Sequence, residues 1–347
     1  MKILRFILFI FNLLFAVLLI GSTLAGIVSP SRFIWFSLLS YAYLPLLLVN
    51  VGFIVLWLFM HRWGWLLSAA AIVLRISFLP LFFQLGGTAD VSKPDESQLK
   101  VMTFNLHNFA GRNGDRPDPQ HGSEFIALVR QEQPDVLCLQ EFVNPKGNAV
   151  SDTLKQMGYT YRKGVRDRRA GLTLFSRLPI TTSKDIGSGG KLYADIKKNG
   201  KAVRLVCVHL TSYHLGKGDI ATPGSDSREV AAKSKGIAHK MGIAVRNHED
   251  EWHRHLKPVI ESTTTPLLLM GDCNDTPSSY FYHQVTQCLS DTFRERGSGM
   301  GITYHGLFPA FRIDYIFHSP TLHPMAYKRV KTDISDHYPL IAVFEID

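Results

Sequence analysis

Polar side chains stand at the ends of five short apolar runs, where they could do chemistry together. One such ending means little, because strands often end in Asn or Asp turns. Five in one stretch of chain favour a shared site at one end of a sheet. These side chains are Asn105 after MTF, Glu141 after VLCLQ, His209 in VCVHL, Asp272 and Asn274 after LLLM, and Asp336 with His337 before YPLIAVF.

The chemistry of this set is that of carboxylate, amide and imidazole groups, and no Cys/His cluster accompanies them. Oxygen ligands favour a hard cation over zinc, so Mg²⁺ is expected, with Mn²⁺ or Ca²⁺ as alternatives. Hydrolysis of a phosphate ester needs a cation for the phosphoryl oxygens, a base for water and help for the leaving oxygen. These residue types can supply all three.

The elements that must position these groups are short strands alternating with helices. A short helix is expected over 123–131 and a long one over 226–261, with Ser225 or Asp226 as its cap. The runs support an α/β or α+β domain over residues 99–347, but periodicity alone does not fix its topology. Strands are expected over 101–105, 136–140, 171–176, 203–210, 267–270 and 313–318.

The first 86 residues have a different composition. The stretches 6–31 and 33–60 contain no charged residue, and each is long enough to cross a bilayer, which takes about 20 apolar residues. A third stretch, 63–85, is also long enough but carries Arg75 and Pro80. We therefore expect an all-α transmembrane region of about three helices over 1–86, followed by a linker over 87–98.

The basic residues around these stretches predict the orientation of the chain. Lys2, Arg5 and Arg62 fall on one side of three spans and Arg32 on the other, which places the N-terminus in the cytoplasm. We expect a multi-pass protein of a cell inner or plasma membrane, with its large domain outside the cytoplasm. The membrane is the expected partner of the N-terminal helices, and no protein partner is predicted.

The net charge of +9 is shared between the two regions, leaving about +6 beyond residue 98. This surplus suits an anionic substrate or a lipid surface and is too small to demand nucleic acid. Its densest part is the stretch 162–169, which includes Arg169. This stretch is either a solvated loop or a contact surface for phosphates, in which case Arg169 binds substrate.

The motifs resemble, in order and in separation, those of the endonuclease/exonuclease/phosphatase family, whose members include nucleases, sphingomyelinases and inositol phosphatases. The resemblance covers about residues 99–347 and implies a four-layer sandwich of two β-sheets flanked by helices. Each motif alone is weakly specific, whereas the ordered set is strong. The motifs are MTFNLHNF, LQE, VHL, GDCND, RIDYIF and SDHYPL.

The resemblance also implies a role for each residue of the motifs. Glu141 becomes the principal metal ligand, assisted by Asn105 and Asp336. Asp272 becomes the residue that orients or deprotonates water, and Asn274 holds that water or a phosphate oxygen. The remaining assignments are His209 and His337 as donors to the phosphate and Asp314 as the residue that fixes the tautomer of His337.

Tyr304 lies where the family often has an aromatic residue near the substrate, although core packing explains it equally well. The expected function is hydrolysis of a phosphodiester, with nucleic acid and phospholipid as the two substrate classes. Two alternatives stay open: a phosphomonoesterase of the inositol phosphate type, and a catalytically silent membrane-bound binding module.

Two other features predict no site. His248 and His253 are five residues apart on the long helix, so their rings diverge too far to share one ion. We interpret the stretch 248–253 as a solvated helix face. Cys138 and Cys207 lie in apolar runs and are expected to be small core residues.

Overall fold

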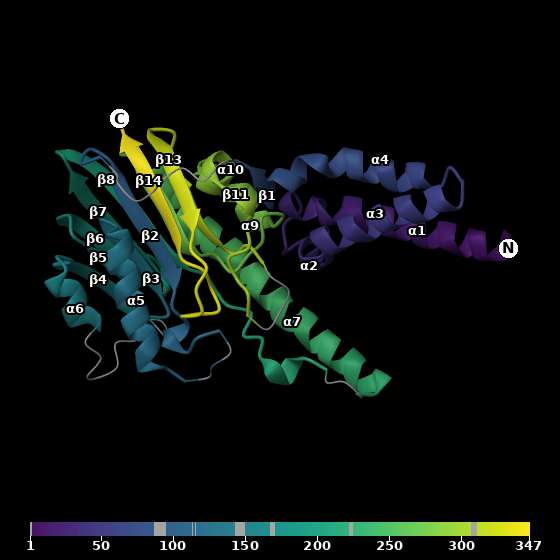
Figure 1. Ribbon diagram of the computed structural model, residues 1–347, viewed down its shortest axis with the longest axis horizontal. Helices are drawn as coiled ribbons and strands as arrows, with labels where there is room; N and C mark the ends of the chain where they lie inside the picture. The colour runs from purple at the N-terminus through teal and green to yellow at the C-terminus, as the bar shows by residue number, and fades with distance from the viewer. Residues whose placement is uncertain are drawn as a thin grey trace. The chain divides into compact units, whose positions relative to one another are not determined.

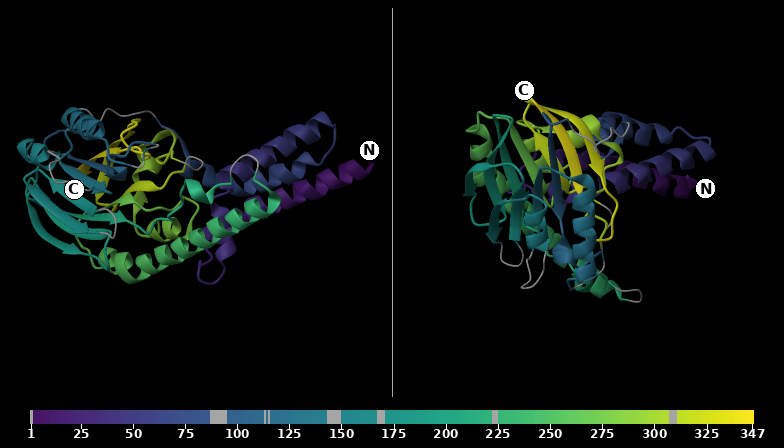
Figure 2. Two further views of the ribbon diagram at one scale, coloured as in Figure 1. Left: turned by 90° about the horizontal axis from the view of Figure 1, so that it is seen from below. Right: turned by 60° about the vertical axis from the view of Figure 1, so that its left-hand side comes forward.

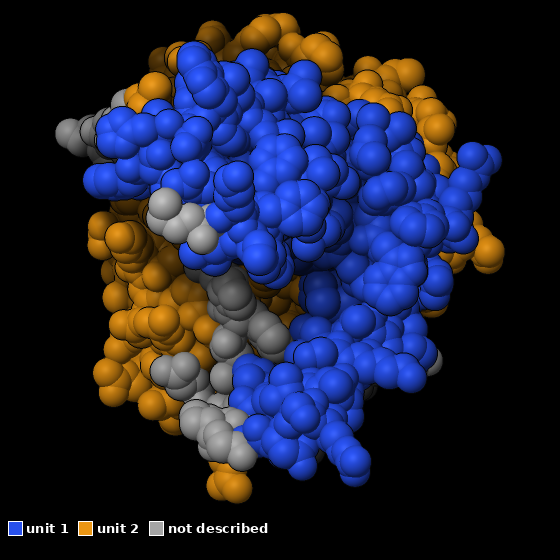
Figure 3. Space-filling model, turned by 90° about the vertical axis from the view of Figure 1, so that its right-hand side faces the viewer, with its two compact units in different colours: residues 1–82, 213–249, 275–285 blue, residues 83–212, 250–274, 286–347 orange. Residues whose placement is uncertain are grey.

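The computed structural model describes residues 2–86, 95–112, 114, 116–142, 150–166, 171–221, 225–306 and 311–347. The chain forms two compact units, coloured separately in Figure 3. Residues 1–82, 213–249 and 275–285 form unit 1, and residues 83–212, 250–274 and 286–347 form unit 2. Most of the predicted linker lies outside the described residues, and the predicted domain boundaries stay a prediction.

Unit 2 is built on two six-stranded mixed sheets, here called sheet I and sheet II. Sheet I has the order β13-β14-β2-β3-β5-β4, and sheet II has the order β10-β12-β9-β8-β7-β6. The strands of sheet I are β2 (Leu99–Asn105), β3 (Val136–Gln140), β4 (Tyr161–Arg166), β5 (Gly171–Ser176), β13 (Leu322–Arg329) and β14 (Leu340–Ile346). Those of sheet II are β6 (Ile180–Asp185), β7 (Lys191–Lys198), β8 (Lys201–His209), β9 (Leu267–Asp272), β10 (Ser290–Asp291) and β12 (Asp314–His318).

Alternation along the strands produces two hydrophobic cores. Val101 and Cys138 of sheet I join Leu205 and Met270 of sheet II in one cluster, so this face of each sheet is turned toward the other. Phe104, on the opposite face of sheet I, belongs to a second cluster with helical residues. The helices of that cluster are α5 (Pro119–Glu132) and α6 (Val150–Gln156), which Figures 1 and 2 show beside sheet I.

Helical segments also flank sheet II. A π-helical turn, η5 (Trp252–Leu256), leads into α8 (Lys257–Glu261). The ring of His255 lies against Gly187, so closely that a Cβ at Gly187 would approach it to 2.9 Å. The other short elements of unit 2 are β1 (Phe83–Leu85), β11 (Ser298–Met300), η3 (His107–Phe109) and α10 (Thr292–Arg296). Unit 2 is thus a pair of mixed sheets flanked by helices, as predicted.

The strand registers explain why the predicted site residues gather at one end of unit 2. Each sheet contains one parallel pair, β2 with β3 and β8 with β9, so the carboxyl ends of both strands of a pair meet at one edge. Asn105 pairs with Gln140 in the first, and His209 with Asp272 in the second. Antiparallel β12 begins at Asp314, directly opposite Asp272.

The helices of unit 1 are α1 (Lys2–Ser22), η1 (Leu24–Gly26), α2 (Ile34–Ser40), α3 (Tyr43–Phe59), α4 (Trp65–Arg75), η2 (Ile76–Leu81), η4 (Lys217–Asp219), α9 (Tyr280–Val285) and most of α7 (Ser227–Glu251). Together, α1 and η1 form the apolar helix Lys2–Gly26, which is long enough to cross a membrane. Ile34–Ser40 and Tyr43–Phe59 reach that length only as a pair bent by 69°. Trp65–Leu81 is shorter.

The structure therefore corrects the prediction of about three membrane helices. The second stretch breaks before Tyr43, where Pro45 suits the first turn of a new helix. The third does not continue to Leu85, because the chain narrows to a 3₁₀ helix around Pro80 and then forms strand β1, paired with β11. Within the part of the chain that the structure describes, one candidate span remains, or two if the bent pair is counted.

Apolar helices of unit 1 have their polar side chains inside and their large apolar side chains outside. Asn12, Asn50 and Ser68 are fully buried and hydrogen-bonded together, with Ser68 Oγ 2.5 Å from Asn12 Oδ1 and 2.8 Å from Asn50 Oδ1. Phe6 and Leu48, in contrast, are 67% and 71% exposed. Small polar residues that join helices from within are typical of membrane bundles.

One prediction about the long helix is wrong. The helical run from Ser227 to Glu261 agrees closely with the predicted bounds, but His248 is fully buried rather than solvated. Its Nδ1 lies 3.1 Å from Asp275 Oδ2, and Trp252 one turn later is buried as well. Helical periodicity excluded a shared metal ion for His248 and His253 but could not reveal a buried acidic partner.

Candidate active site

Asp272 lies at the centre of the candidate site. Its side chain is 1% exposed at the end of β9. Oδ2 accepts a hydrogen bond from Asn105 Nδ2 at 2.9 Å, and Oδ1 accepts one from the backbone N–H of Asn274 at 2.8 Å. Burial and the neighbouring carboxylate of Asp314 raise the pKa of Asp272 to about 6. A carboxylate with such a pKa can accept a proton near neutral pH.

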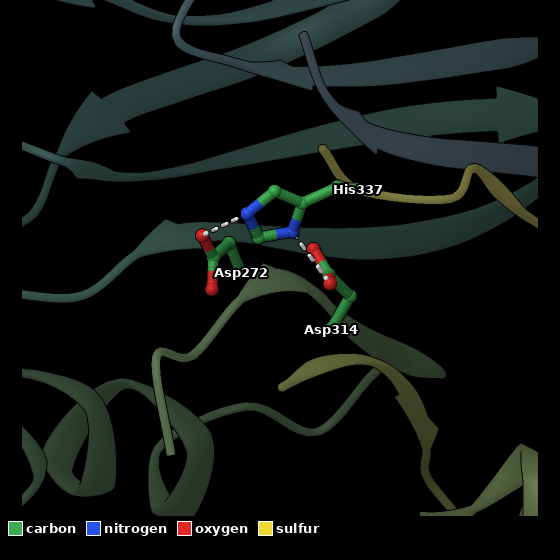
Figure 4. A group of neighbouring side chains, drawn as sticks. All are labelled: Asp272, Asp314 and His337. Atoms are coloured by element: carbon green, nitrogen blue, oxygen red, sulfur yellow. Dashed lines mark hydrogen bonds and ion pairs between the residues drawn. The ribbon is translucent and has the colours of Figure 1, made fainter. Parts of the chain in front are cut away.

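His337 and Asp314 form a carboxylate–imidazole pair beside Asp272 (Figure 4). Asp314 Oδ2 accepts from His337 Nδ1 at 2.8 Å, which leaves Nε2 directed toward Asp272 Oδ2 at 3.8 Å. Burial disfavours the protonated ring, but the charges of Asp314 and Asp272 outweigh it and raise the pKa of His337 well above its ordinary value. His337 is therefore a cationic donor whose orientation is fixed by the bond from its Nδ1 to Asp314.

His209 reaches the same oxygen from another direction. Its Nε2 lies 3.8 Å from Asp272 Oδ2 and 3.7 Å from Glu141 Oε1. Both ring nitrogens are buried, and neither makes a hydrogen bond with the residues that the structure describes. An unsatisfied buried polar group costs about 1 to 3 kcal/mol, so His209 is suited to a bound group that supplies the missing partner.

Glu141 follows β3 in a backbone conformation that its side chain does not favour. Its φ is +50°, in the left-handed region, which costs a non-glycine residue about 1 kcal/mol. The carboxylate accepts from Asn105 Nδ2 at 3.2 Å. Burial alone would raise the pKa of Glu141, but His209 and the Asn105 amide outweigh it and lower the pKa below its ordinary range. Such strain at an ionised, partly exposed carboxylate is typical of functional positions.

Two groups of residues could hold a divalent cation. Asp272, Asp314 and His337 each offer a ligand atom, and these atoms lie within 4.8 Å of one another. In that group, however, Asp314 and His337 already bond to each other. In the group predicted from the sequence, Glu141 with Asn105 and Asp336, two members also bond to each other, Asn105 Nδ2 to Glu141 Oε1, but its two carboxylates and one amide offer only oxygen ligands, which a hard cation prefers.

Side-chain contacts connect the segment that carries Asp336 to the segment that carries Asn105. Asp336 Oδ1 lies 3.4 Å from His107 Nδ1, and the backbone N–H of His107 donates to Asn105 Oδ1 at 3.0 Å. Ser335 Oγ donates to the backbone oxygen of Asn105 at 2.7 Å. The two segments that carry the predicted ligands are therefore joined by hydrogen bonds.

Tyr304, the predicted substrate-binding aromatic, also lies at the site. It forms a β-bridge with His337, and its ring meets the imidazole edge-on with centroids 5.1 Å apart. Arg169, the other predicted substrate-binding residue, lies outside the described residues. All eight predicted catalytic and metal-binding residues lie in unit 2. Hydrogen bonds or ion pairs link seven of them directly, and Asp336 joins them through His107.

Sequence reasoning missed three residues of this surrounding shell. His107 and Ser335 lie inside the quoted motifs. His107 comes two residues after Asn105 and Ser335 one residue before Asp336, so their closeness in sequence to predicted ligands could have identified them. His305 stacks on Tyr338 with ring centroids 3.9 Å apart, and no pattern in the sequence indicated that contact.

Two substitutions of Asn274 separate the role of its side-chain amide from the cost of its backbone conformation. Its φ is +48°, and its Nδ2 donates to the Leu210 carbonyl at 3.1 Å. We expect Asn274→Gly and Asn274→Ala to lose turnover equally, because both lack the amide. Both variants lose the bond to the Leu210 carbonyl, but Asn274→Ala should lower the melting temperature further, because alanine at positive φ costs about 1 kcal/mol. Equal melting temperatures, measured by fluorimetry of the full chain in detergent, would contradict this account.

Two family models match different parts of the chain. A model of the endonuclease/exonuclease/phosphatase family matches residues 102–337, and a model described as a domain of unknown function matches residues 5–82. A comparison with curated proteins finds no match.

Solved structures show the same fold. A crystal structure of an endonuclease/exonuclease/phosphatase from Beutenbergia cavernae is 21% identical, with a TM-score of 0.50 over 72% of each chain. The human Nocturnin catalytic domain with bound sulfate is 16% identical, with a TM-score of 0.52 over 76% of this chain and 97% of that one. With the family model matching most of its length, the chain belongs to the endonuclease/exonuclease/phosphatase family.

Proposed function

We propose that the protein is a metal-dependent phosphodiesterase anchored to a membrane. The observation that carries the proposal is the convergence of two imidazoles on one carboxylate: His209 Nε2 and His337 Nε2 each lie 3.8 Å from Asp272 Oδ2. These distances are too long for direct hydrogen bonds, and they suit a bound water that accepts from the two imidazoles and donates to Asp272 Oδ2. Members of this family are hydrolases of phosphate esters, which agrees with that chemistry.

The residues divide the work of in-line hydrolysis. Asp272 orients the attacking water and accepts its proton, and Asn274 holds the water or a phosphoryl oxygen. His209 and His337 donate to the oxygens on which negative charge develops, a contribution of several kcal/mol for well-placed donors. Asp314 keeps Nδ1 of His337 protonated and so holds its Nε2 toward the substrate.

Glu141, Asn105 and Asp336 would hold the divalent cation, for which Mg²⁺ is the first candidate. When bound, it would neutralise phosphoryl charge and stabilise the leaving oxygen.

Membrane anchoring is supported by unit 1. Helix Lys2–Gly26 is apolar and long enough to cross a bilayer, and few of its residues are buried. A core helix of a soluble protein would be mostly buried instead. With Lys2 and Arg5 in the cytoplasm, one span places unit 2 outside it, whereas a second span formed by the bent pair would return unit 2 to the cytoplasm. Anchoring favours a phospholipid as the substrate class, with nucleic acid as the second class.

The orientation can be tested with Cys288, which is exposed while Cys138, Cys207 and Cys273 are buried. We expect a membrane-impermeant maleimide to label Cys288 on intact cells. Cys288→Ser should abolish that labelling. Labelling that appears only after the cells are permeabilised would place unit 2 in the cytoplasm.

The function itself is tested on the full chain in lipid nanodiscs with a substrate panel. The panel contains a sphingomyelin-type lipid, plasmid DNA, RNA, an inositol phosphate and bis-p-nitrophenyl phosphate, each with Mg²⁺ and with EDTA. We expect Mg²⁺-dependent cleavage of a diester that is lost in Asp272→Asn. Preferential release of phosphate from the inositol phosphate would instead support a monoesterase, and no cleavage of any substrate would overturn the proposal.

A further inference from the structure

Within unit 1, a buried carboxylate joins the N-terminal helices to the segment that follows Asn274. Asp275 is 2% exposed. Its Oδ1 accepts from the hydroxyl of Tyr41 at 2.7 Å, and its Oδ2 lies 3.1 Å from His248 Nδ1. Since a carboxylate only accepts, His248 donates through Nδ1. Tyr41 comes from the end of α2 and His248 from α7, so three distant segments meet at one side chain.

Further contacts in unit 1 strengthen this junction. Tyr213 bonds to the hydroxyl of Tyr41, and its ring meets that of His248 edge-on with centroids 5.8 Å apart. Ser278 Oγ donates to the Ser40 carbonyl at 2.9 Å, a second link between the same two parts of the chain. The segment 275–278 is therefore held to the end of α2 by two independent hydrogen bonds.

Asp275 is also placed where it can act on the site through the chain. It follows Asn274, whose positive φ costs energy and needs support from both sides. On the N-terminal side, the Asn274 N–H donates to Asp272 Oδ1 and its Nδ2 to the Leu210 carbonyl. On the C-terminal side, Asp275 Oδ1 also accepts from the backbone N–H of Thr276 at 3.0 Å. The oxygen that Tyr41 contacts is therefore also bonded to the backbone directly after Asn274.

We propose that Asp275 is a positioning residue for Asn274 and that Tyr41, in the N-terminal region, holds it in place. The N-terminal helices would then be required for full turnover as well as for anchoring. The effect on turnover rests on the proposed function, whereas the hydrogen-bonded junction does not. Hydrogen bonds to a charged group are worth more than neutral ones, so the loss of one hydroxyl should be measurable.

The test uses Tyr41→Phe in the full chain, with Tyr43→Phe as its matched control. Tyr43 lies two residues away and donates to the Arg75 carbonyl at 3.1 Å, so Tyr43→Phe also removes one hydroxyl bond in the same region. We expect Tyr41→Phe to lower kcat about 10-fold with KM unchanged, since small misplacements of a reacting group carry large rate costs. Tyr43→Phe should leave both constants unchanged.

A double-variant cycle separates positioning from a general loss of stability. In an Asn274→Gly background, Tyr41→Phe should have no further effect on kcat, because the side chain through which it acts is gone. A 10-fold loss in both backgrounds would overturn the positioning role, as would no loss in either.

Hydrogen exchange of residues 272–279 tests the junction without any substrate. We expect faster exchange in Tyr41→Phe than in Tyr43→Phe or the unaltered chain. Equal exchange in all three would overturn the inference even if the protein is an active phosphodiesterase. Faster exchange in a chain that cleaves none of the panel substrates would sustain the junction and refute only the proposed function.

Discussion

Replacing His337 by glutamine is expected to lower kcat by about 1,000-fold, within the range measured for lost general acids and oxyanion donors. Glutamine can still bond to Asp314, but it cannot carry the positive charge that Asp314 and Asp272 stabilise on the imidazole. KM should change far less than kcat, because the donor acts mainly on charge that develops in the transition state. Steady-state kinetics on the preferred diester measure both.

Asp314→Asn tests the same pair from its other side. An asparagine at 314 removes the negative charge behind His337 and can select the wrong tautomer, so we expect about 100-fold lower kcat. The double variant should be no slower than His337→Gln alone, since the two residues act as one unit. Multiplicative losses in the double variant would show that Asp314 acts independently of His337.

An exposed imidazole–carboxylate pair provides the control. His323 Nε2 lies 2.9 Å from Asp347 Oδ2, and His323 is 53% exposed on β13. His323→Gln removes the same kind of pair outside the candidate site and should leave kcat unchanged. A similar loss in both histidine variants would attribute the effect to general destabilisation.

Glu141→Gln is expected to abolish tight binding of Mg²⁺ and to lower turnover by about 1,000-fold or more at ordinary metal concentrations. The substitution keeps the size of the side chain and the bond to Asn105 but removes the anionic oxygen. Its melting temperature should fall only slightly, because the bond to Asn105 is kept and only the electrostatic interaction with His209 is lost. Calorimetric titration of the full chain in detergent measures the affinity for Mg²⁺ directly.

The same titration decides between the two possible ligand groups. If Glu141, Asn105 and Asp336 hold the ion, His337→Gln should bind Mg²⁺ with near-normal affinity while failing to turn over substrate. If Asp272, Asp314 and His337 hold it, the affinity should fall in His337→Gln and persist in Glu141→Gln. The latter pattern would refute our assignment of the metal site.

Much of unit 2 was predictable because each motif combines an apolar strand with a polar ending. The parallel registers of β2 with β3 and of β8 with β9, which the strand pattern did not predict, then bring those endings together. The carboxylate–imidazole pair of Asp314 and His337 was predicted by family resemblance. Its 2.8 Å distance shows that the two motifs meet.

Unit 1 was harder to predict because length and apolarity do not reveal where a helix bends. The stretch 33–60 breaks between Ser40 and Tyr43, and the third stretch ends in strand β1. The polar residues next to His248 predict a solvated side chain. Its buried partner, Asp275, lies 27 residues further along the chain, where a local pattern does not reach. Such contacts depend on tertiary structure, which local patterns do not encode.

The central claim is tested most directly by the rate at which the full chain hydrolyses bis-p-nitrophenyl phosphate, measured with Mg²⁺ and with EDTA. The account predicts turnover with Mg²⁺, its loss in EDTA, recovery on adding Mg²⁺ back, and no turnover in Asp272→Asn under any condition. Turnover that survives EDTA, or that persists in Asp272→Asn, would contradict a metal-dependent phosphodiesterase centred on this carboxylate.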